Sequence, residues 1–206
     1  MLDLAFVLAL SQSCAPSVAP QTLAAIAHVE SRFDPLAIGV NRNGARPARS
    51  RNATEAATTA RRLLSRGANL DLGLAQINSD NLGWLGLTVE DTFDPCLNLR
   101  AAATVLRAGY RPVGETPAHR QSALRVALSR YNTGDARRGF RNGYVARVEQ
   151  AAVALNLAGP LSATVVEPSD ARLPEPPPPN APPAAWDVFA RGPVRVAFST
   201  FVDRSH

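Results

Sequence analysis

One carboxyl group, that of Glu30, stands at the end of a mostly apolar segment in AHVESRFDPLA, residues 27–37. Three apolar residues share its helix face at the i, i+3, i+4 and i+7 spacing: Leu23, Ile26 and Ala27. A carboxyl group that loses water on such a face has a raised pKa, so it can hold a proton near neutral pH. Glu30 could therefore give that proton to a leaving oxygen. The residues alone leave open that Glu30 instead caps the helix or pairs with an arginine such as Arg32.

Two later motifs carry side chains suited to binding a polar substrate. GLAQIN, residues 73–78, supplies the amides of Gln76 and Asn78. Amides both donate and accept hydrogen bonds, which suits sugar hydroxyl and acetamido groups. SRYNTG, residues 129–134, ends a predicted helix with Tyr131 and Asn132, and a tyrosine hydroxyl could bond a carboxylate. Taken singly, the first motif also fits an ordinary polar loop and the second a helix C-terminus.

Other chemistries find no support in the residue pattern. The three histidines are scattered, and neither an H-x-x-x-H nor a C-x-x-C spacing occurs, so we predict no metal and no cofactor. All 22 basic residues are arginine and the net charge is +5, which is compatible with an anionic polymer. We predict no nucleic-acid partner because the arginines do not interleave with an aromatic RNA-reading motif. No apolar run reaches the ~18 residues of a membrane span.

Helical patterns dominate the first 160 residues. Residues 40–53 form a polar, arginine-rich stretch, and 69–86 reads as a loop or short turns. The sequence therefore predicts a mainly α domain over 1–160 with one long loop region. Helices are expected at six places: 3–12, 20–30, 54–66, 94–111, 117–134 and 143–158.

The composition changes after about residue 160. Eight of the seventeen prolines fall between 168 and 183, which predicts a flexible Pro-rich linker over 161–185. A short apolar tail segment, 186–206, follows. At the other end, MLDLAFVLAL lacks the basic residues of a signal peptide, so we expect it to form the first helix of the domain.

Cys14 and Cys96 are the two cysteines of the chain. Counting leaves two readings open: two buried thiols, or one disulfide formed in an oxidising compartment. A bridge would close a loop of about 80 residues and contribute roughly 4 kcal/mol in the chain-entropy model.

Three segments, taken in order, resemble the lytic transglycosylases, the family with a goose-type lysozyme-like SLT domain. They are ESRFDPLAIG at 30–39, GLAQIN at 73–78 and SRYNTG at 129–134. The stretch DLGLAQINSDNLGWLGLTVEDTFDPCLNL is most similar to the VirB1-like branch, which serves type IV secretion systems. The resemblance covers roughly 10–155. Each motif is weak alone, and the ordered set is specific.

The resemblance implies a lysozyme-like enzyme that cleaves peptidoglycan between N-acetylmuramic acid and N-acetylglucosamine. Glu30 would protonate the glycosidic oxygen and then take the proton of the muramic C6 hydroxyl, which closes a 1,6-anhydro ring without water. Ser31 would bind near the acid, and Gln76 and Asn78 would line the cleft. Tyr131 would orient Glu30, with Asn132 near it.

The same resemblance implies a Cys14–Cys96 disulfide and a periplasmic location, although no export signal is evident in this chain. Ala75 stands where the family has the methionine of GLMQ, and Arg130 stands where it has a small residue before the tyrosine. The first departure implies that a methionine contact with the sugar is lost or replaced, and neither departure removes the acid. The expected partners are peptidoglycan strands and, through the C-terminal tail, components of a secretion apparatus.

Two rival functions remain at this point. A hydrolytic muramidase would need a second carboxylate to activate water, and Asp71 and Asp94 are the candidates near the cleft motifs. A non-catalytic scaffold that binds peptidoglycan and positions secretion components would need no acid at all.

Overall fold

The computed structural model describes residues 1–41, 44–45 and 47–157, and in this part of the chain helices predominate. This confirms the mainly α prediction, with helix boundaries close to the expected ones. The predicted linker 161–185 and tail 186–206 lie outside the described residues. The helices and short 3-10 turns are α1 (Leu4–Cys14), α2 (Pro20–Ser31), α3 (Ala53–Leu64), η1 (Ser79–Asn81), α4 (Leu82–Leu85), η2 (Asp91–Phe93), α5 (Pro95–Gly109), α6 (Pro117–Thr133), α7 (Arg138–Arg141) and α8 (Tyr144–Ala154).

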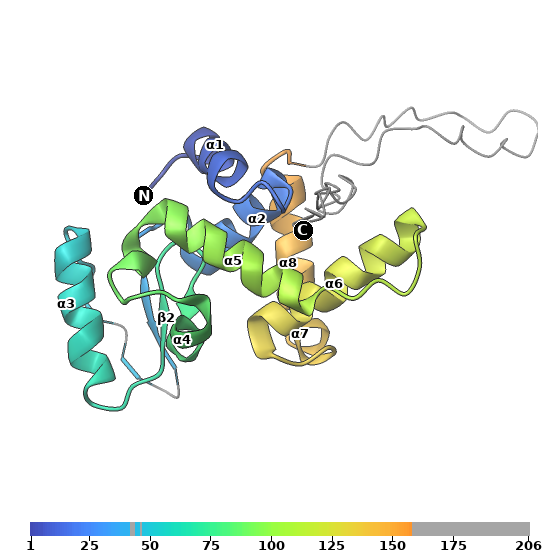
Figure 1. The fold of residues 1–206 in the computed structure, drawn as a ribbon. Coiled ribbons are helices and arrows are strands. Elements are labelled where there is room, and N and C mark those ends of the chain that lie inside the picture. Colours follow the sequence, from blue (N-terminus) through green and yellow to red (C-terminus); the bar gives the residue numbers. More distant parts are fainter. Residues whose placement is uncertain (42–43, 46, 158–206) are drawn as a thin grey trace, which may run out of the picture.

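The helix that carries Glu30, α2, lies in the core of the molecule. It begins with Pro20, whose fixed φ suits the first helical position. The apolar residues that define its predicted inner face, Leu23, Ile26 and Ala27, have no exposed surface. α2 packs against α1 and α8, and α5 runs across the same core (Figure 1). The apolar face therefore fixes the position of α2 and of the carboxyl group at its end.

A small antiparallel sheet, missed in the sequence, lies beside the helical core. Its strands pair in the order β1 (Ile38–Val40), β2 (Leu70–Leu72) and β3 (Ile77–Asn78). In the register, Gly39 stands opposite Asp71, and Asp71 opposite Asn78. The expectation of loop or short turns over 69–86 was therefore wrong for β2 and β3. Strands of two or three residues are too short to show an alternating pattern.

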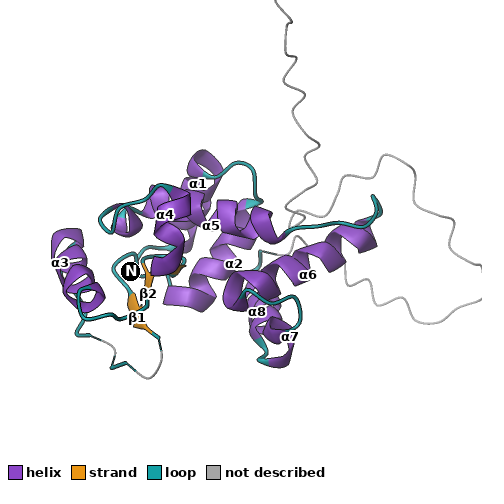
Figure 2. Ribbon diagram, turned by 60° about the horizontal axis from the view of Figure 1, so that its bottom comes forward, coloured by secondary structure: helices purple, strands orange, loops and turns teal. Residues whose placement is uncertain are grey.

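The sheet and α3 lie at one end of the molecule, and α6, α7 and α8 lie at the other (Figures 1 and 2). α2 and α5 run between these two groups. The end of α2 thus lies where strands and helices meet. Within the described residues, no helix is long and apolar enough to cross a membrane.

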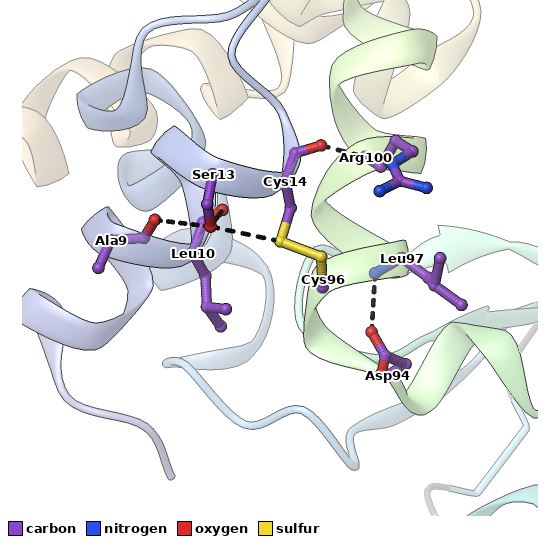
Figure 3. Close-up of a disulfide and its surroundings, with 8 residues drawn as sticks. All are labelled: Ala9, Leu10, Ser13, Cys14, Asp94, Cys96, Leu97 and Arg100. Atoms are coloured by element: carbon purple, nitrogen blue, oxygen red, sulfur yellow. Dashed lines mark hydrogen bonds between the residues drawn. A yellow bond between two sulfur atoms is a disulfide. The ribbon is translucent and has the colours of Figure 1, made fainter.

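Cys14 and Cys96 form a disulfide, as the resemblance implied (Figure 3). It joins the last residue of α1 to the first turn of α5, and the two cysteines are 82 residues apart in the sequence. Closing a loop of this length contributes roughly 4 kcal/mol in the chain-entropy model. The bridge ties the first helix to the helix that crosses the core.

Candidate active site

Glu30 lies in the last turn of α2, and the chain reverses direction immediately after it. Arg32 and Phe33 both adopt left-handed backbone angles, with φ of 57° and 64°. Such angles are uncommon for residues other than glycine and mark a backbone held by its surroundings. Phe33 is buried and supplies part of that hold. The reversal leaves the Glu30 side chain at the junction of the helical core and the sheet.

Ser31 connects this helix end to the GLAQIN loop. Its hydroxyl donates to the carbonyl of Leu74 at 2.6 Å and accepts the amide N–H of Asp34 at 3.1 Å. The residue is buried. These bonds hold the acid's helix against the loop, so they explain the position of Glu30 without a direct contact to substrate. The expected role of Ser31 in binding stays a prediction.

The carboxyl group of Glu30 is partly desolvated, and within the described part of the chain it accepts one hydrogen bond, from Tyr144. The Tyr144 hydroxyl donates to Glu30 Oε1 at 2.6 Å. Partial burial raises the pKa of Glu30 from 4.5 to about 7, and the charge of Asp71 adds to the rise. The Tyr144 hydrogen bond and the charge of Arg147 oppose it. The carboxyl group can therefore hold a proton near neutral pH.

Arg32 does not pair with Glu30. Its guanidinium lies 3.2 Å from the His28 ring nitrogen Nε2, one turn earlier on the same helix. No ion pair among the described residues includes Glu30. The alternative of a glutamate paired with Arg32 is therefore wrong, and a partly buried acid without an ion pair among the described residues remains.

The tyrosine that orients Glu30 is not the expected one. Tyr131 donates its hydroxyl hydrogen bond to the carbonyl of Ala75 at 2.7 Å, so the implied Tyr131–Glu30 hydrogen bond is wrong. Tyr144, at the start of α8 and 1% exposed, takes that place. Little in the sequence pointed to Tyr144, because 114 residues separate it from Glu30. Only the packing of α8 on α2 brings the two side chains together.

A cleft of about 750 Å³ opens beside Glu30. Four of the predicted site residues line it together with the acid: Gln76, Asn78, Tyr131 and Asn132. A second cavity of about 460 Å³ also borders Glu30, and Ser31 and Arg49 are among its lining residues. Glu30 borders both spaces, so an extended chain could pass over it.

The GLAQIN loop has a backbone shape that few residues allow. Gly73 has a φ of +76°, and a Cβ there would lie 2.0 Å from the carbonyl oxygen of Thr92. Gln76 is also left-handed, with a φ of 53°. Its amide nitrogen donates to the carbonyls of Gly73 and Ala37, at 2.9 and 3.2 Å. The side-chain amide is therefore fixed at the edge of the cleft.

Asn98, which was not among the predicted site residues, holds the GLAQIN loop in place. It is fully buried on α5. Its amide nitrogen donates to the carbonyls of Leu72 and Thr92, and its oxygen accepts the N–H of Ala75. A buried asparagine whose side-chain nitrogen and oxygen are both hydrogen-bonded holds the backbone segments around it in one arrangement. A single asparagine on an amphipathic helix gave no signal of this role.

Three asparagines and one aspartate line the sheet side of the cleft. Asn78 donates to Asp71 Oδ1 at 2.7 Å and Asn41 donates to Asp71 Oδ2 at 3.0 Å. Both amide nitrogens also lie within bonding distance of Asn69 Oδ1, at 2.8 and 2.7 Å. Asn41 and Asn69 were not among the predicted site residues. Asn41 and Asn69 are 28 residues apart in the sequence, and only the pairing of the strands brings their side chains together.

Of the two candidate second carboxylates, only Asp71 lines the cleft. Asp94 is exposed and caps α5 by accepting the N–H of Leu97 at 2.8 Å. The described residues contain no cluster of three or more histidine, cysteine, aspartate or glutamate side chains that could hold a metal ion. The site thus combines one protonatable glutamate, one amide-bound aspartate and a row of amides.

Residues 8–153 match the family model described as Transglycosylase SLT domain. Similar proteins include the protein virB1 of Rhizobium radiobacter, 50% identical over 145 residues. That of Agrobacterium fabrum is 48% identical over 153 residues, and the type IV secretion system protein virB1 of Brucella abortus is 46% identical over 136 residues. These alignments cover 70%, 74% and 65% of this chain.

The aligned parts span 60%, 61% and 56% of the three relatives, so the relatives are similar to this chain over little more than half of their own length. No solved structure matches the chain. The matches confirm the resemblance to VirB1-like SLT domains drawn from the three motifs.

Proposed function

This chain belongs to the family of transglycosylase SLT domains, and from that premise we propose that it is a peptidoglycan lytic transglycosylase. It would cleave the β-1,4 bond between N-acetylmuramic acid and N-acetylglucosamine and leave a 1,6-anhydromuramic end. The observation that carries the proposal is Glu30, whose pKa of about 7 lets a single carboxyl group both give and take a proton at neutral pH.

The first step uses Glu30 as a general acid. Tyr144 occupies Oε1, so the other carboxyl oxygen is left to carry the proton. Transfer of that proton to the glycosidic oxygen lets the C1–O bond break, and the N-acetylglucosamine side departs as an alcohol. Positive charge develops at C1 of the muramic acid residue.

The second step uses the same carboxyl group, now ionised, as a base. It takes the proton of the C6 hydroxyl while O6 bonds to C1, which closes the anhydro ring and returns Glu30 to its protonated form. No water enters the balance. A pKa near neutrality suits both steps because neither protonation state is strongly disfavoured.

The walls of the cleft support a saccharide as the substrate. The side-chain oxygen of Gln76 and the amide nitrogen of Asn132 can pair with hydroxyl and acetamido groups. The Asn78 amide nitrogen, in contrast, is engaged by Asp71 and Asn69. Trp84 on α4 is 54% exposed, and its indole N–H donates to Asn81, which lines the cleft. An exposed aromatic ring fixed beside amides suits the mixed apolar and polar faces of a sugar.

The relatives suggest the setting of the reaction. The Brucella abortus relative is named a type IV secretion system protein, and we propose that this chain opens the cell wall locally for such an apparatus. A protein that acts on peptidoglycan in this way would work in the periplasm. The segments 161–185 and 186–206 would act as linker and partner contact for other secretion components. The domain division at about residue 160 is part of the same proposal.

Mass spectrometry of the muropeptides released from purified sacculi tests the function. The wild-type protein should release anhydro-muropeptides, and Glu30→Gln should release none while it keeps its fold and binds sacculi. Reducing-end products would indicate a hydrolytic muramidase instead. If neither protein released fragments and both bound sacculi, the non-catalytic scaffold would be the better account.

A further inference from the structure

Asp71 is a second carboxylate in the cleft, and the proposed reaction gives it no role. It lies in the middle of β2 and lines the same cleft as Glu30. The two groups are close enough for the charge of Asp71 to raise the pKa of Glu30. A reaction that runs on one acid does not require this neighbour. Its presence beside the acid therefore needs its own explanation.

The carboxylate is held in place by amide groups on both of its oxygens. Asn78 bonds Oδ1 at 2.7 Å and Asn41 bonds Oδ2 at 3.0 Å. Asn69 lies within bonding distance of both of these amides and so fixes them in turn. The backbone of Asp71 is paired on both sides, with β1 and with β3. The orientation of the carboxylate is therefore set before any substrate arrives.

Among the described residues no cation lies within ion-pair distance of this carboxylate, although Arg130 and Arg138 line the same cleft. The ion pairs there join other acids to arginines, for example Asp34 to Arg49 at 2.9 Å, and none includes Asp71. A guanidinium would orient a carboxylate and cancel its charge as well. Neutral amides orient it and leave the negative charge directed at whatever occupies the cleft.

We propose that Asp71 is a second catalytic residue, whose carboxylate stabilises the positive charge that develops at the anomeric carbon as the glycosidic bond breaks. The inference rests on the proposed function and deepens it. Transition states of glycosidic cleavage resemble an oxocarbenium ion. A fixed opposite charge in a site that excludes water lowers the energy of such a state without reorganisation.

Asp71 forms no bond and moves no proton in this step. The proton passes from Glu30 to the glycosidic oxygen, the C1–O bond breaks, O6 bonds to C1, and the C6 hydroxyl proton returns to Glu30. The aspartate carries the same charge before and after. Its effect is confined to the barrier between the two states.

Asp71→Asn tests the role, because it removes the charge and keeps nearly the same shape. We expect the rate of anhydro-muropeptide release to fall about 100-fold, with binding to sacculi retained. We also expect the alkaline limb of the pH–rate profile to move to lower pH, since the charge of Asp71 contributes to the raised pKa of Glu30. Should Asp71→Asn fail to fold, Asp71→Ala serves for the same measurements.

Two controls separate charge from structure. Asp94→Asn makes the same change outside the cleft and keeps a helix-capping oxygen, so its rate should equal that of the wild type. Asn69→Ala loosens the asparagine network and leaves the Asp71 charge. It should lose less than Asp71→Asn and keep the alkaline limb where the wild type has it.

Wild-type rate and pH profile in Asp71→Asn would overturn the inference while the proposed function stood. So would an equal loss in Asn69→Ala with no shift of the alkaline limb in Asp71→Asn, since that pattern indicates a structural role. Reducing-end products that depend on Asp71 would assign it to water activation and overturn the inference as well. An inactive wild-type protein would overturn the proposed function together with this inference.

Discussion

Glu30 and Asp71 face one cleft from two differently built walls. Glu30 comes from the helical wall, where the packing of α8 on α2 removes water and leaves one hydroxyl, that of Tyr144, on the carboxyl group. Asp71 comes from the sheet wall, where the register sets Asn78 opposite it and each of its oxygens receives an amide hydrogen bond. Two carboxyl groups of nearly the same chemistry therefore lie in different surroundings: a hydroxyl contacts one, and amides contact the other. The difference shows that the wall, and not the residue type, decides which groups contact each carboxyl group.

The largest effect on this arrangement should come from Asn98, which ties α5 to the loop that continues the sheet wall. Asn98→Ala removes three hydrogen bonds from a fully buried position. We expect a loss of about 3–5 kcal/mol in the free energy of unfolding. Urea denaturation measures it. The exposed Asn132, changed to alanine as a control, should alter the unfolding free energy by less than about 0.5 kcal/mol. A loss near that of the control would mean that the GLAQIN loop keeps its place on α5 without Asn98.

The next effect concerns the helical wall, whose Glu30 should make the free energy of unfolding depend on pH. Because the folded state raises the pKa of Glu30 from 4.5 to about 7, the folded state prefers the neutral form. The group's contribution to stability is therefore complete below pH 4.5 and is lost as the pH rises through about 7. The loss amounts to at most about 3 kcal/mol. Glu30→Gln escapes it, because glutamine does not titrate.

Thermal unfolding of both proteins across this range tests the expectation. Glu30→Gln should match the wild type at pH 4 and be more stable at pH 8 by up to about 3 kcal/mol. The difference between the two proteins cancels the titration of every other group. A constant difference across the range would show that the helical wall does not desolvate the acid.

The smallest effect concerns the single hydroxyl on the acid. Tyr144→Phe removes the 2.6 Å hydrogen bond that orients Glu30 and lowers its pKa. We expect cleavage to slow about tenfold, as for the loss of one charge-assisted hydrogen bond, and the alkaline limb to move to higher pH. The pH dependence of kcat/KM measures both.

Tyr131→Phe is the matched control for this shift. Its hydroxyl bonds the Ala75 carbonyl, so its loss should leave the alkaline limb unmoved. A shift with Tyr131→Phe and none with Tyr144→Phe would reverse the assignment of the two tyrosines.

Much of the helical wall could be predicted from local pattern. The spacing of Leu23, Ile26 and Ala27 fixed the face on which Glu30 lies, since a helix repeats its faces every three or four residues. The same reasoning placed the other long helices. The sheet wall was not predicted because its strands are only two or three residues long. Asn41 and Asn69 gained meaning only once the strands were paired.

The sequence by itself determined the acid, the order of the three cleft motifs and the mainly α class, because these depend on residue type and short-range periodicity. Only the tertiary structure decided which tyrosine touches Glu30, which of Asp71 and Asp94 lines the cleft, and how Asn98 holds the GLAQIN loop. These are contacts between residues that lie far apart along the chain, up to 114 positions for Tyr144 and Glu30. Such contacts depend on how whole elements pack, and no local pattern encodes them.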